Sequence, residues 1–527
     1  MTPVTETRSY NFQPQPRLMG LFLVMAGTLV IIAAGALLAS EQPLLALATI
    51  LALPFIIAML TWPDVATLAT IFILYSNIAV VAVKFHDVPY LVGAAFPLLL
   101  IIPLTGYLLM RRQKLVFTPA LPFMLLFLFV QLLGTLFARN VNEAFSELTV
   151  FIIEGLGIYF LITNVVRTPR MLRRVVWVLL LAGVMLAAVP IYQQMTGQFD
   201  NIYGGFGQIS ERGFRTGEET LFGDVRQLRL SGTIGEQNRF AQILLMLVPL
   251  GLFRFWRGGE HSMALRLLAV LSTIVVTAGV VLTFSRGAAV GFLVMVMVMA
   301  IMRLIKPHHL VAVLVVAVLV LATLPQYGTR LASLQSLPNF FSEDQSLDDG
   351  ILESRSTEMI AAFMVFADHP LVGVGPGMFK YYSAEYGEQI NPGVLEGTRE
   401  AHSLYLGIAA DHGLLGLLSF LAIIFVTLSI LLRSREQLAR SRPELLNLVN
   451  AFILAIVSYL ATGFFLHLSY ARYLWLILAV AGAAGAIARE SKKLTIAEAP
   501  SPMEPSAGWA VLSEARPLPF QSEEARR

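Results

Sequence analysis

The sequence predicts an all-α polytopic membrane protein with about 14 transmembrane helices and two external loops. The first observation is composition: of 527 residues, 57% are hydrophobic and 13% are charged, whereas soluble domains carry roughly 25% charged residues. The second is that apolar runs long enough to cross a bilayer recur along the chain. The third is that Lys and Arg gather at alternate ends of these runs. These features exclude an ordinary soluble enzyme, a disordered chain and a nucleic-acid-binding protein.

The predicted spans are stretches of about 20 residues without charge. The clearest are 18–40, 42–63, 65–83, 88–110, 115–138, 175–199, 267–285, 307–329, 412–432 and 445–471. Shorter or interrupted candidates are 148–166, 240–256, 287–302 and 473–488. The first run is longer than a signal-peptide core, so it is predicted to be retained as a span after a cytoplasmic N-terminus, residues 1–17. The Pro-rich segment 490–527 predicts a disordered cytoplasmic tail.

The distribution of basic residues predicts the orientation of the transmembrane domain, residues 18–489. Most of the 37 Lys and Arg residues fall in segments that are cytoplasmic if the N-terminus is inside. Two long loops, 196–238 and 326–401, then lie outside. The short external turns hold only Lys84, Arg139, Arg286 and Arg472. Because basic residues are rare at this outer edge, the arginines found there are the first candidates for function.

Arg286 is the strongest of these candidates. One apolar run ends at Phe284, Arg286 follows, and Gly287 is predicted to let the next helix begin at once. A guanidinium held at the outer membrane edge suits a phosphate or diphosphate at headgroup depth, because it is planar and weakly hydrated. The alternative is an arginine that only anchors the helix at the interface.

His402 lies directly before the predicted span 412–432. A neutral imidazole at the membrane boundary can accept a proton near neutral pH. The alternative is an interfacial histidine without chemistry. Asp411 is nine positions further on, about 900° around a helix, so it would face away from His402.

Other polar groups give weaker signals. Arg229, Asn238 and Arg239 mark the return of the first external loop to the membrane and could face a polar ligand. Glu154 lies in the outer third of its span, where an acid is costly unless paired, so we expect it to hold an arginine in place. The acidic residues 343–349 are interpreted as a solvated loop. Cysteine is absent, which excludes disulfides and Cys-ligated zinc, and neither a metal site nor a cofactor is predicted.

Taken in order, these motifs resemble the O-antigen ligase and O-antigen polymerase superfamily of bacterial envelope glycan enzymes. The matching elements are Arg229-Leu-Ser-Gly with Asn238-Arg-Phe-Ala, Phe284-Ser-Arg-Gly, Arg355 ahead of the stretch His369 to Phe379, and Ala401-His-Ser-Leu-Tyr with Asp411 to Gly416. The resemblance covers roughly 220–425 in motif detail. Two positions depart from the family pattern: Ser403 replaces an Asn, and Asp411 replaces a Glu.

The resemblance implies a glycosyltransferase C type of fold and metal-independent, inverting transfer of a glycan. The donor would be undecaprenyl-diphosphate-linked glycan, and the acceptor a hydroxyl of lipid A–core or of another glycan. The reaction would take place at the outer face of the bacterial inner membrane. His402 would orient or deprotonate the acceptor hydroxyl. Arg286, Arg355 and, less surely, Arg229 would stabilise the leaving diphosphate, with Arg239, Arg472 and Glu154 as supporting residues.

Several functions remain open on the sequence. Ligation to lipid A–core and polymerisation of a glycan chain use the same chemistry, and the ligase is the preferred interpretation. A flippase or exporter of lipid-linked glycan should instead carry charged groups and broken helices near mid-membrane. A non-catalytic scaffold would leave Arg286 and His402 without a reason. Apart from the membrane lipids, the partners expected are therefore a lipid-linked glycan donor and its acceptor.

Overall fold

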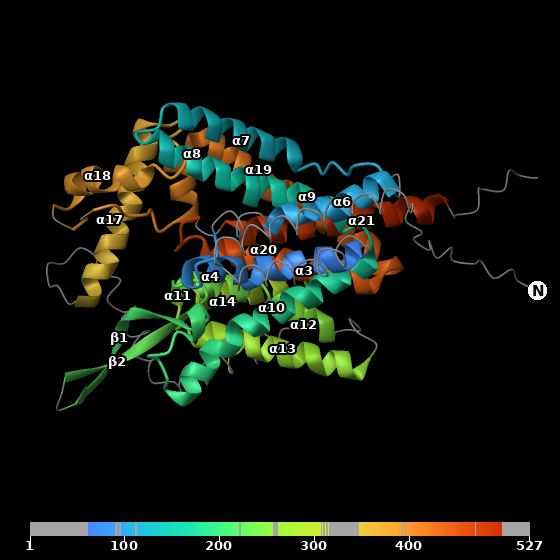
Figure 1. The fold of residues 1–527 in the computed structure, drawn as a ribbon, viewed down its shortest axis with the longest axis horizontal. Coiled ribbons are helices and arrows are strands. Elements are labelled where there is room, and N and C mark those ends of the chain that lie inside the picture. The colour runs from blue at the N-terminus through green and yellow to red at the C-terminus, as the bar shows by residue number, and fades with distance from the viewer. Residues whose placement is uncertain are drawn as a thin grey trace, which may run out of the picture.

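The computed structural model describes residues 62–497, except for most of 90–95 and 307–346 and for 111–112, 221–222, 257–261, 393, 396 and 469–470. The described chain is mostly helical, which confirms the predicted class in its coarse form. Figure 1 shows the long helices running side by side along the long axis of the molecule. At one end the bundle carries a β-hairpin and two helices, α17 and α18, which stand apart from the long helices.

The elements that precede residue 306 form the first part of the bundle. They are α3 (Pro63–Ser76), α4 (Ile78–Phe85), η1 (Phe96–Leu100), α6 (Ile101–Thr105), η2 (Gly106–Met110), α7 (Leu121–Leu136), α8 (Val141–Val150), η3 (Phe151–Gly157), α9 (Ile158–Val165), α10 (Pro169–Thr196), η4 (Tyr203–Gly205), β1 (Gln208–Thr220), β2 (Gly223–Gly232), α11 (Gln237–Leu245), α12 (Val248–Phe255), α13 (Met263–Val281) and α14 (Arg286–Ile301). The elements η2 and η3 are π-helical turns.

The elements after residue 346 form the second part of the bundle and the two helices at its end. They are α17 (Leu347–Asp368), η7 (Phe379–Tyr381), α18 (Ser383–Ile390), α19 (Leu404–Ser441), α20 (Pro443–Thr462) and α21 (Arg472–Ala497). Helices α20 and α21 lie at the centre, because about four fifths of the side chains in their apolar windows are buried. Helix α13 lies at the edge, since only 28% of its window is buried. Helix α21 continues past the predicted domain boundary at 489, and the tail after Ala497 lies outside the described residues.

The apolar helices of the structure coincide with predicted membrane spans. Within the described residues, seven helices are long and apolar enough to cross a membrane, or eight if the bent pair α3 and α4 forms one span. They coincide with predicted spans, and three shorter apolar helices, Phe96–Leu108, Leu121–Leu136 and Arg286–Ile301, coincide with three more. The predicted spans 18–40, 42–63 and 307–329 lie largely outside the described residues. A multi-pass membrane protein is thus supported, while the count of 14 stays a prediction.

The hairpin β1–β2 lies within the segment predicted to be external loop 196–238 and adds two strands to the predicted all-α architecture. The two strands are antiparallel, Thr220 is paired with Gly223 at the tip, and the register shifts at three places. The segment alternates charged, polar and glycine residues rather than apolar and polar ones, so it lacks the period-2 apolar pattern by which strands are recognised. Its backbone hydrogen bonds are satisfied between the strands, whatever the side chains are.

The predicted span 445–471 is too long at its C-terminal end. Helix α20 ends at Thr462, and residues 463–468, here called the α20–α21 turn, fold back over the start of α19. The amide of Leu404 donates to the carbonyl of Gly463 at 2.7 Å, which ties the turn to α19. Because this stretch carries no charge, hydropathy alone did not separate it from the helix. The turn brings His467 next to the start of α19.

Helix α19 begins at Leu404, well before the predicted start at 412, because the Ser403 side chain accepts a hydrogen bond from the Leu406 amide and caps it. The helix is broken at Gly413, whose φ of 63° and ψ of −166° are available essentially only to glycine. The glycine-rich segment 373–377 packs against this break: the amides of Val374 and Gly375 donate to the carbonyls of Ala410 and Asp411. The break therefore fixes the glycine-rich loop against the N-terminal part of α19.

Replacing Gly413 by Ala should destabilise the protein. A Cβ at this position would lie 2.4 Å from the backbone carbonyl carbon of Leu371, and the backbone strain alone costs about 1–3 kcal/mol. We expect a lower midpoint of thermal unfolding in detergent. The matched control is Gly407→Ala in the same helix, where a Cβ would meet nothing closer than 3.6 Å. Equal stability of the two variants would contradict this explanation of the helix break.

Candidate active site

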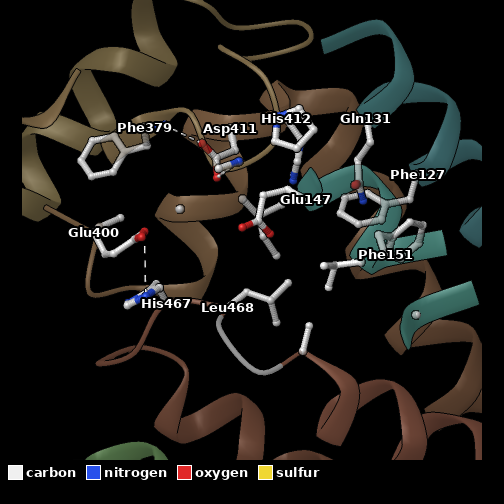
Figure 2. Close-up of a pocket in the computed structure, with 18 of the residues that line it drawn as sticks. Phe127, Gln131, Glu147, Phe151, Phe379, Glu400, Asp411, His412, His467 and Leu468 are labelled. Carbon is white, nitrogen blue, oxygen red and sulfur yellow. Dashed lines mark hydrogen bonds and ion pairs between the residues drawn. The ribbon is translucent and has the colours of Figure 1, made fainter. Parts of the chain in front are cut away.

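A cavity of about 360 Å³ opens between α7, α8, α19, α21 and the loop before η7. Its volume lies within the range of about 300–1,000 Å³ that is typical of small-molecule sites. Figure 2 shows the carboxylates of Glu147, Glu400 and Asp411 gathered around the same space, with His467 and Leu468 of the α20–α21 turn forming another wall. The cavity lies at the ends of α8, α19 and α21 that the charge pattern predicts to be external.

His402 lies next to this cavity and is paired with a buried acid. Its Nδ1 is 2.7 Å from Oε2 of Glu358, a residue of α17 whose side chain is only 2% exposed. The His402 ring itself is 30% exposed. A carboxylate on Nδ1 fixes the orientation of the imidazole and leaves Nε2 available for a substrate hydroxyl. This is the arrangement expected of a histidine that accepts a proton.

The backbone of His402 is in an uncommon conformation. Its φ is 44°, in the left-handed region that few residues other than glycine adopt. Such a conformation costs of the order of 1–3 kcal/mol and persists only where surrounding contacts impose it. Here Ala401 and Ser403 on either side are buried, and Nδ1 also lies 3.1 Å from the carbonyl oxygen of Glu400. The ring packs against His467, which lines the cavity.

A second histidine extends the site. The rings of His402 and His467 pack edge to face, with their centroids 5.8 Å apart. The Arg239 guanidinium donates to the His467 ring, and Oε2 of Glu400 lies 3.9 Å from its Nε2. Burial and the neighbouring Arg239 lower the pKa of His467 well below its usual value, so this ring is neutral at neutral pH. Partial burial raises the pKa of the Glu400 carboxyl, although Lys380 and Arg239 oppose the shift.

Arg286 occupies the first turn of α14. The turn before it is formed by Phe284, whose φ is 53°, and by Ser285, which caps the helix. The sequence assigned this tight turn to Gly287, so the residue responsible was predicted wrongly. Arg229 stabilises the turn: its buried guanidinium donates to the carbonyls of Thr283 at 3.0 Å and Phe284 at 3.5 Å, and to the side chain of Asn238 at 2.9 Å. Arg229 therefore supports the segment that presents Arg286.

Arg355 lies on α17, three positions before Glu358 and half-buried. Residues three apart in a helix are neighbours on one face, so Arg355 and the acid that holds His402 are presented together. The structure thus places one predicted arginine on the helix that carries the partner of His402. It places another, Arg239, against His467.

Glu154 and Arg472 form the predicted acid–arginine pair. Oε1 of Glu154 lies 3.5 Å from a terminal nitrogen of Arg472, which also donates to the side chain of Asn77. Both residues line the inner part of the cavity. The contact is the one expected of an acid within a predicted span. The Asp411 carboxylate also has hydrogen-bond partners, because it accepts from the backbone amides of Gly377 and Phe379.

Two residues of this site were missed by sequence reasoning, Glu358 and His467. Glu358 follows the helical spacing of the buried residues Ala361, Ala362 and Val365, and an acid in line with an apolar face is a usable signal because it is costly to bury unpaired. His467 was assigned to the interior of a predicted span. Within the described residues, no group of three or more His, Asp or Glu side chains is arranged to hold a metal ion.

Replacing Glu358 by Gln should lower turnover while leaving substrate affinity unchanged. The amide keeps the shape but removes the negative charge 2.7 Å from Nδ1 of His402, and an interaction with a charged group contributes about 1.5–3 kcal/mol, or roughly ten- to a hundredfold. The measurement is kcat and KM of glycan transfer. The control is Ser354→Ala, which removes only the 3.4 Å contact to the other oxygen of Glu358. Unchanged kcat in Glu358→Gln would show that the pair has no part in the reaction.

Comparison with known proteins places these residues in a family. No curated protein matches the chain. Residues 267–421 match the family model of the O-antigen ligases. This confirms the O-antigen ligase superfamily, predicted from the motifs, for the segment that carries Arg286, Arg355 and His402, and the family implies glycosyltransferase activity with a lipid-linked glycan and an acceptor as substrates.

Proposed function

We propose that the protein transfers an oligo- or polysaccharide from undecaprenyl diphosphate to an acceptor hydroxyl at the outer face of the bacterial inner membrane, in the manner of an O-antigen ligase. The observation that supports this most is the pair of His402 with the buried Glu358, at the edge of a polar cavity and inside the segment that matches the family.

In the proposed reaction the acceptor oxygen attacks the anomeric carbon of the donor glycan. The new bond joins that oxygen to the anomeric carbon, and the bond from this carbon to the diphosphate oxygen breaks. The diphosphate leaves with the bonding electron pair, and the hydroxyl proton passes to Nε2 of His402. Attack from the face opposite the leaving group inverts the anomeric centre, and charge on the diphosphate is stabilised by protein cations rather than by a metal.

The cations assigned to the diphosphate are Arg286 and Arg355. Both are half-buried. Arg286 follows the turn that Arg229 stabilises, and Arg355 precedes Glu358 on α17. A forked guanidinium in a partly desolvated position forms stronger charge-assisted bonds to phosphate than one in open water. Arg239 acts through His467, and Arg472 with Glu154 shapes the inner cavity.

The acceptor separates ligase from polymerase. The experiment uses the purified full-length protein, undecaprenyl-diphosphate-linked glycan, and either lipid A–core or a second lipid-linked repeat as acceptor, and the products are sized. We expect glycan joined to lipid A–core. A lengthening chain that stays on the carrier would assign the polymerase instead, with the same chemistry. Movement of unconsumed donor across the bilayer, without a new glycosidic bond, would contradict glycan transfer and favour a flippase.

A further inference from the structure

The charge of the cavity is the opposite of what a diphosphate requires. Four carboxylates line it, from Glu147, Glu154, Glu400 and Asp411. Its two cationic side chains are both engaged by acids. Lys380 lies 2.6 Å from Glu143, and Arg472 is paired with Glu154. Glu154 is compensated by Arg472, and Asp411 accepts from two backbone amides. An anionic ligand would still meet the carboxylates of Glu147 and Glu400, which form no ion pair with a Lys or Arg of the lining, in a partly desolvated space, which is costly.

The α20–α21 turn separates this cavity from the start of α14. Phe465 faces α14, since a Cβ on Gly287 would lie 3.5 Å from its side chain. His467 and Leu468, two and three residues further on, line the cavity. Arg286, next to Gly287, is not among the lining residues. His402 packs against His467 of the same turn, so it is placed between the two sides.

The remaining lining suits a sugar ring. The aromatic side chains of Phe127, Phe151 and Trp475 pack on one another and form the apolar inner wall of the cavity. Gln131 and His412 add buried polar groups, and Nδ1 of His412 has no hydrogen-bond partner among the described residues. Ionised carboxylates accept hydrogen bonds, which sugar hydroxyls and ammonium groups donate. Figure 2 shows Gln131, His412 and Glu147 around the same space.

We propose that this cavity is the subsite for the acceptor sugar, and that it selects a neutral or amine-bearing sugar against an anionic one. The inference rests on the proposed function and adds to it a location and a charge class for the acceptor. The donor diphosphate lies on the α14 side of the turn, and the acceptor hydroxyl reaches His402 from the cavity side. The anionic diphosphate then meets arginines, and the neutral or amine-bearing acceptor sugar meets carboxylates.

The first test fills the cavity. Gly407 lines it, and a Cβ there would meet only Ala401 and His467, at 3.6 and 3.9 Å. Gly407→Leu therefore adds a side chain to the space without a backbone clash. The control is Gly106→Leu, which makes the same change outside the cavity lining, where a Cβ would meet nothing within 4 Å. We expect the KM for lipid A–core to rise about tenfold or more in Gly407→Leu, with the KM for the lipid-linked donor unchanged. Gly106→Leu should stay close to wild type in both.

The second test addresses charge. Glucosamine, N-acetylglucosamine and glucuronic acid are compared as inhibitors of the wild-type protein and of Glu147→Gln. We expect the first two to compete with the acceptor and glucuronic acid to be the weakest, and we expect Glu147→Gln to reduce this discrimination. Glu385→Gln, which changes an exposed carboxylate outside the cavity, is the control and should keep the wild-type order.

The outcomes distinguish the two levels of the proposal. If wild-type protein joins no glycan to either acceptor, the proposed function fails. If wild-type protein transfers glycan but Gly407→Leu raises the donor KM instead, or changes neither KM, the acceptor subsite is overturned and the proposed function stands. Equal inhibition by all three sugars would overturn the charge selection.

Discussion

Replacing His402 by Ala should reduce glycan transfer by about 10²–10⁴-fold, the usual contribution of a general base. The loss should appear in kcat, because the ring acts on the acceptor hydroxyl as the bond forms. The KM for the donor should change little, since the diphosphate is assigned to arginines. The measurement is the rate of transfer at saturating donor and acceptor.

The control for this variant is His86→Ala. His86 is an exposed histidine whose Nε2 lies 3.0 Å from the carbonyl oxygen of Gly204, away from the cavity lining. It should transfer glycan at the wild-type rate. If His402→Ala folds, elutes as wild type and keeps its kcat, then His402 is not the base and the pairing with Glu358 serves structure alone.

Replacing Arg286 by Ala should lower kcat by about 10²–10³-fold, the range found when a group that stabilises developing charge is removed. The diphosphate gains charge as the glycosidic bond breaks, so the interaction is stronger in the transition state than in the bound donor. Arg286→Lys keeps the charge but loses the planar fork. We expect it to lie between wild type and Ala, about tenfold below wild type, as for one lost charge-assisted bond.

The matched control is Arg139→Ala. Arg139 is also at the predicted outer edge, but its exposed guanidinium contacts Glu385 and the Tyr382 ring. Its removal should leave kcat within about twofold, as is usual for exposed ion pairs. If Arg286→Ala and Arg139→Ala behave alike, then Arg286 is an interfacial anchor, the alternative that the sequence left open.

Two kinds of feature could be predicted from the sequence: apolar runs that recur along the chain, and polar residues at the ends of those runs or within them. Apolar length predicted each span that the structure describes, because bilayer thickness imposes a minimum on every helix. His402 and Arg286 stood out because each is a polar residue at the end of an apolar run. The cost of an unpaired acid within a span predicted that Glu154 would hold an arginine, and Arg472 is that partner.

The missed features depend on contacts between distant segments. Glu358 acquires its role only because α17 packs against the start of α19, 44 positions later at His402. His467 was hidden in an uncharged stretch, and only the tie from Leu404 to Gly463 shows that the chain turns there. The break at Gly413 is likewise set by its fit against Leu371. None of these contacts has a local pattern in the sequence.

The central claim is that one site, built on His402 and the outer arginines, consumes a lipid-linked donor to glycosylate an acceptor. The most direct measurement is stoichiometric: full-length protein in liposomes receives labelled undecaprenyl-diphosphate-linked glycan and lipid A–core, and both products are counted. The account predicts one undecaprenyl diphosphate released for each glycan joined, with both products lost in the double variant His402→Ala, Arg286→Ala. Equal product in wild type and double variant, or donor translocated intact with no diphosphate released, would contradict it.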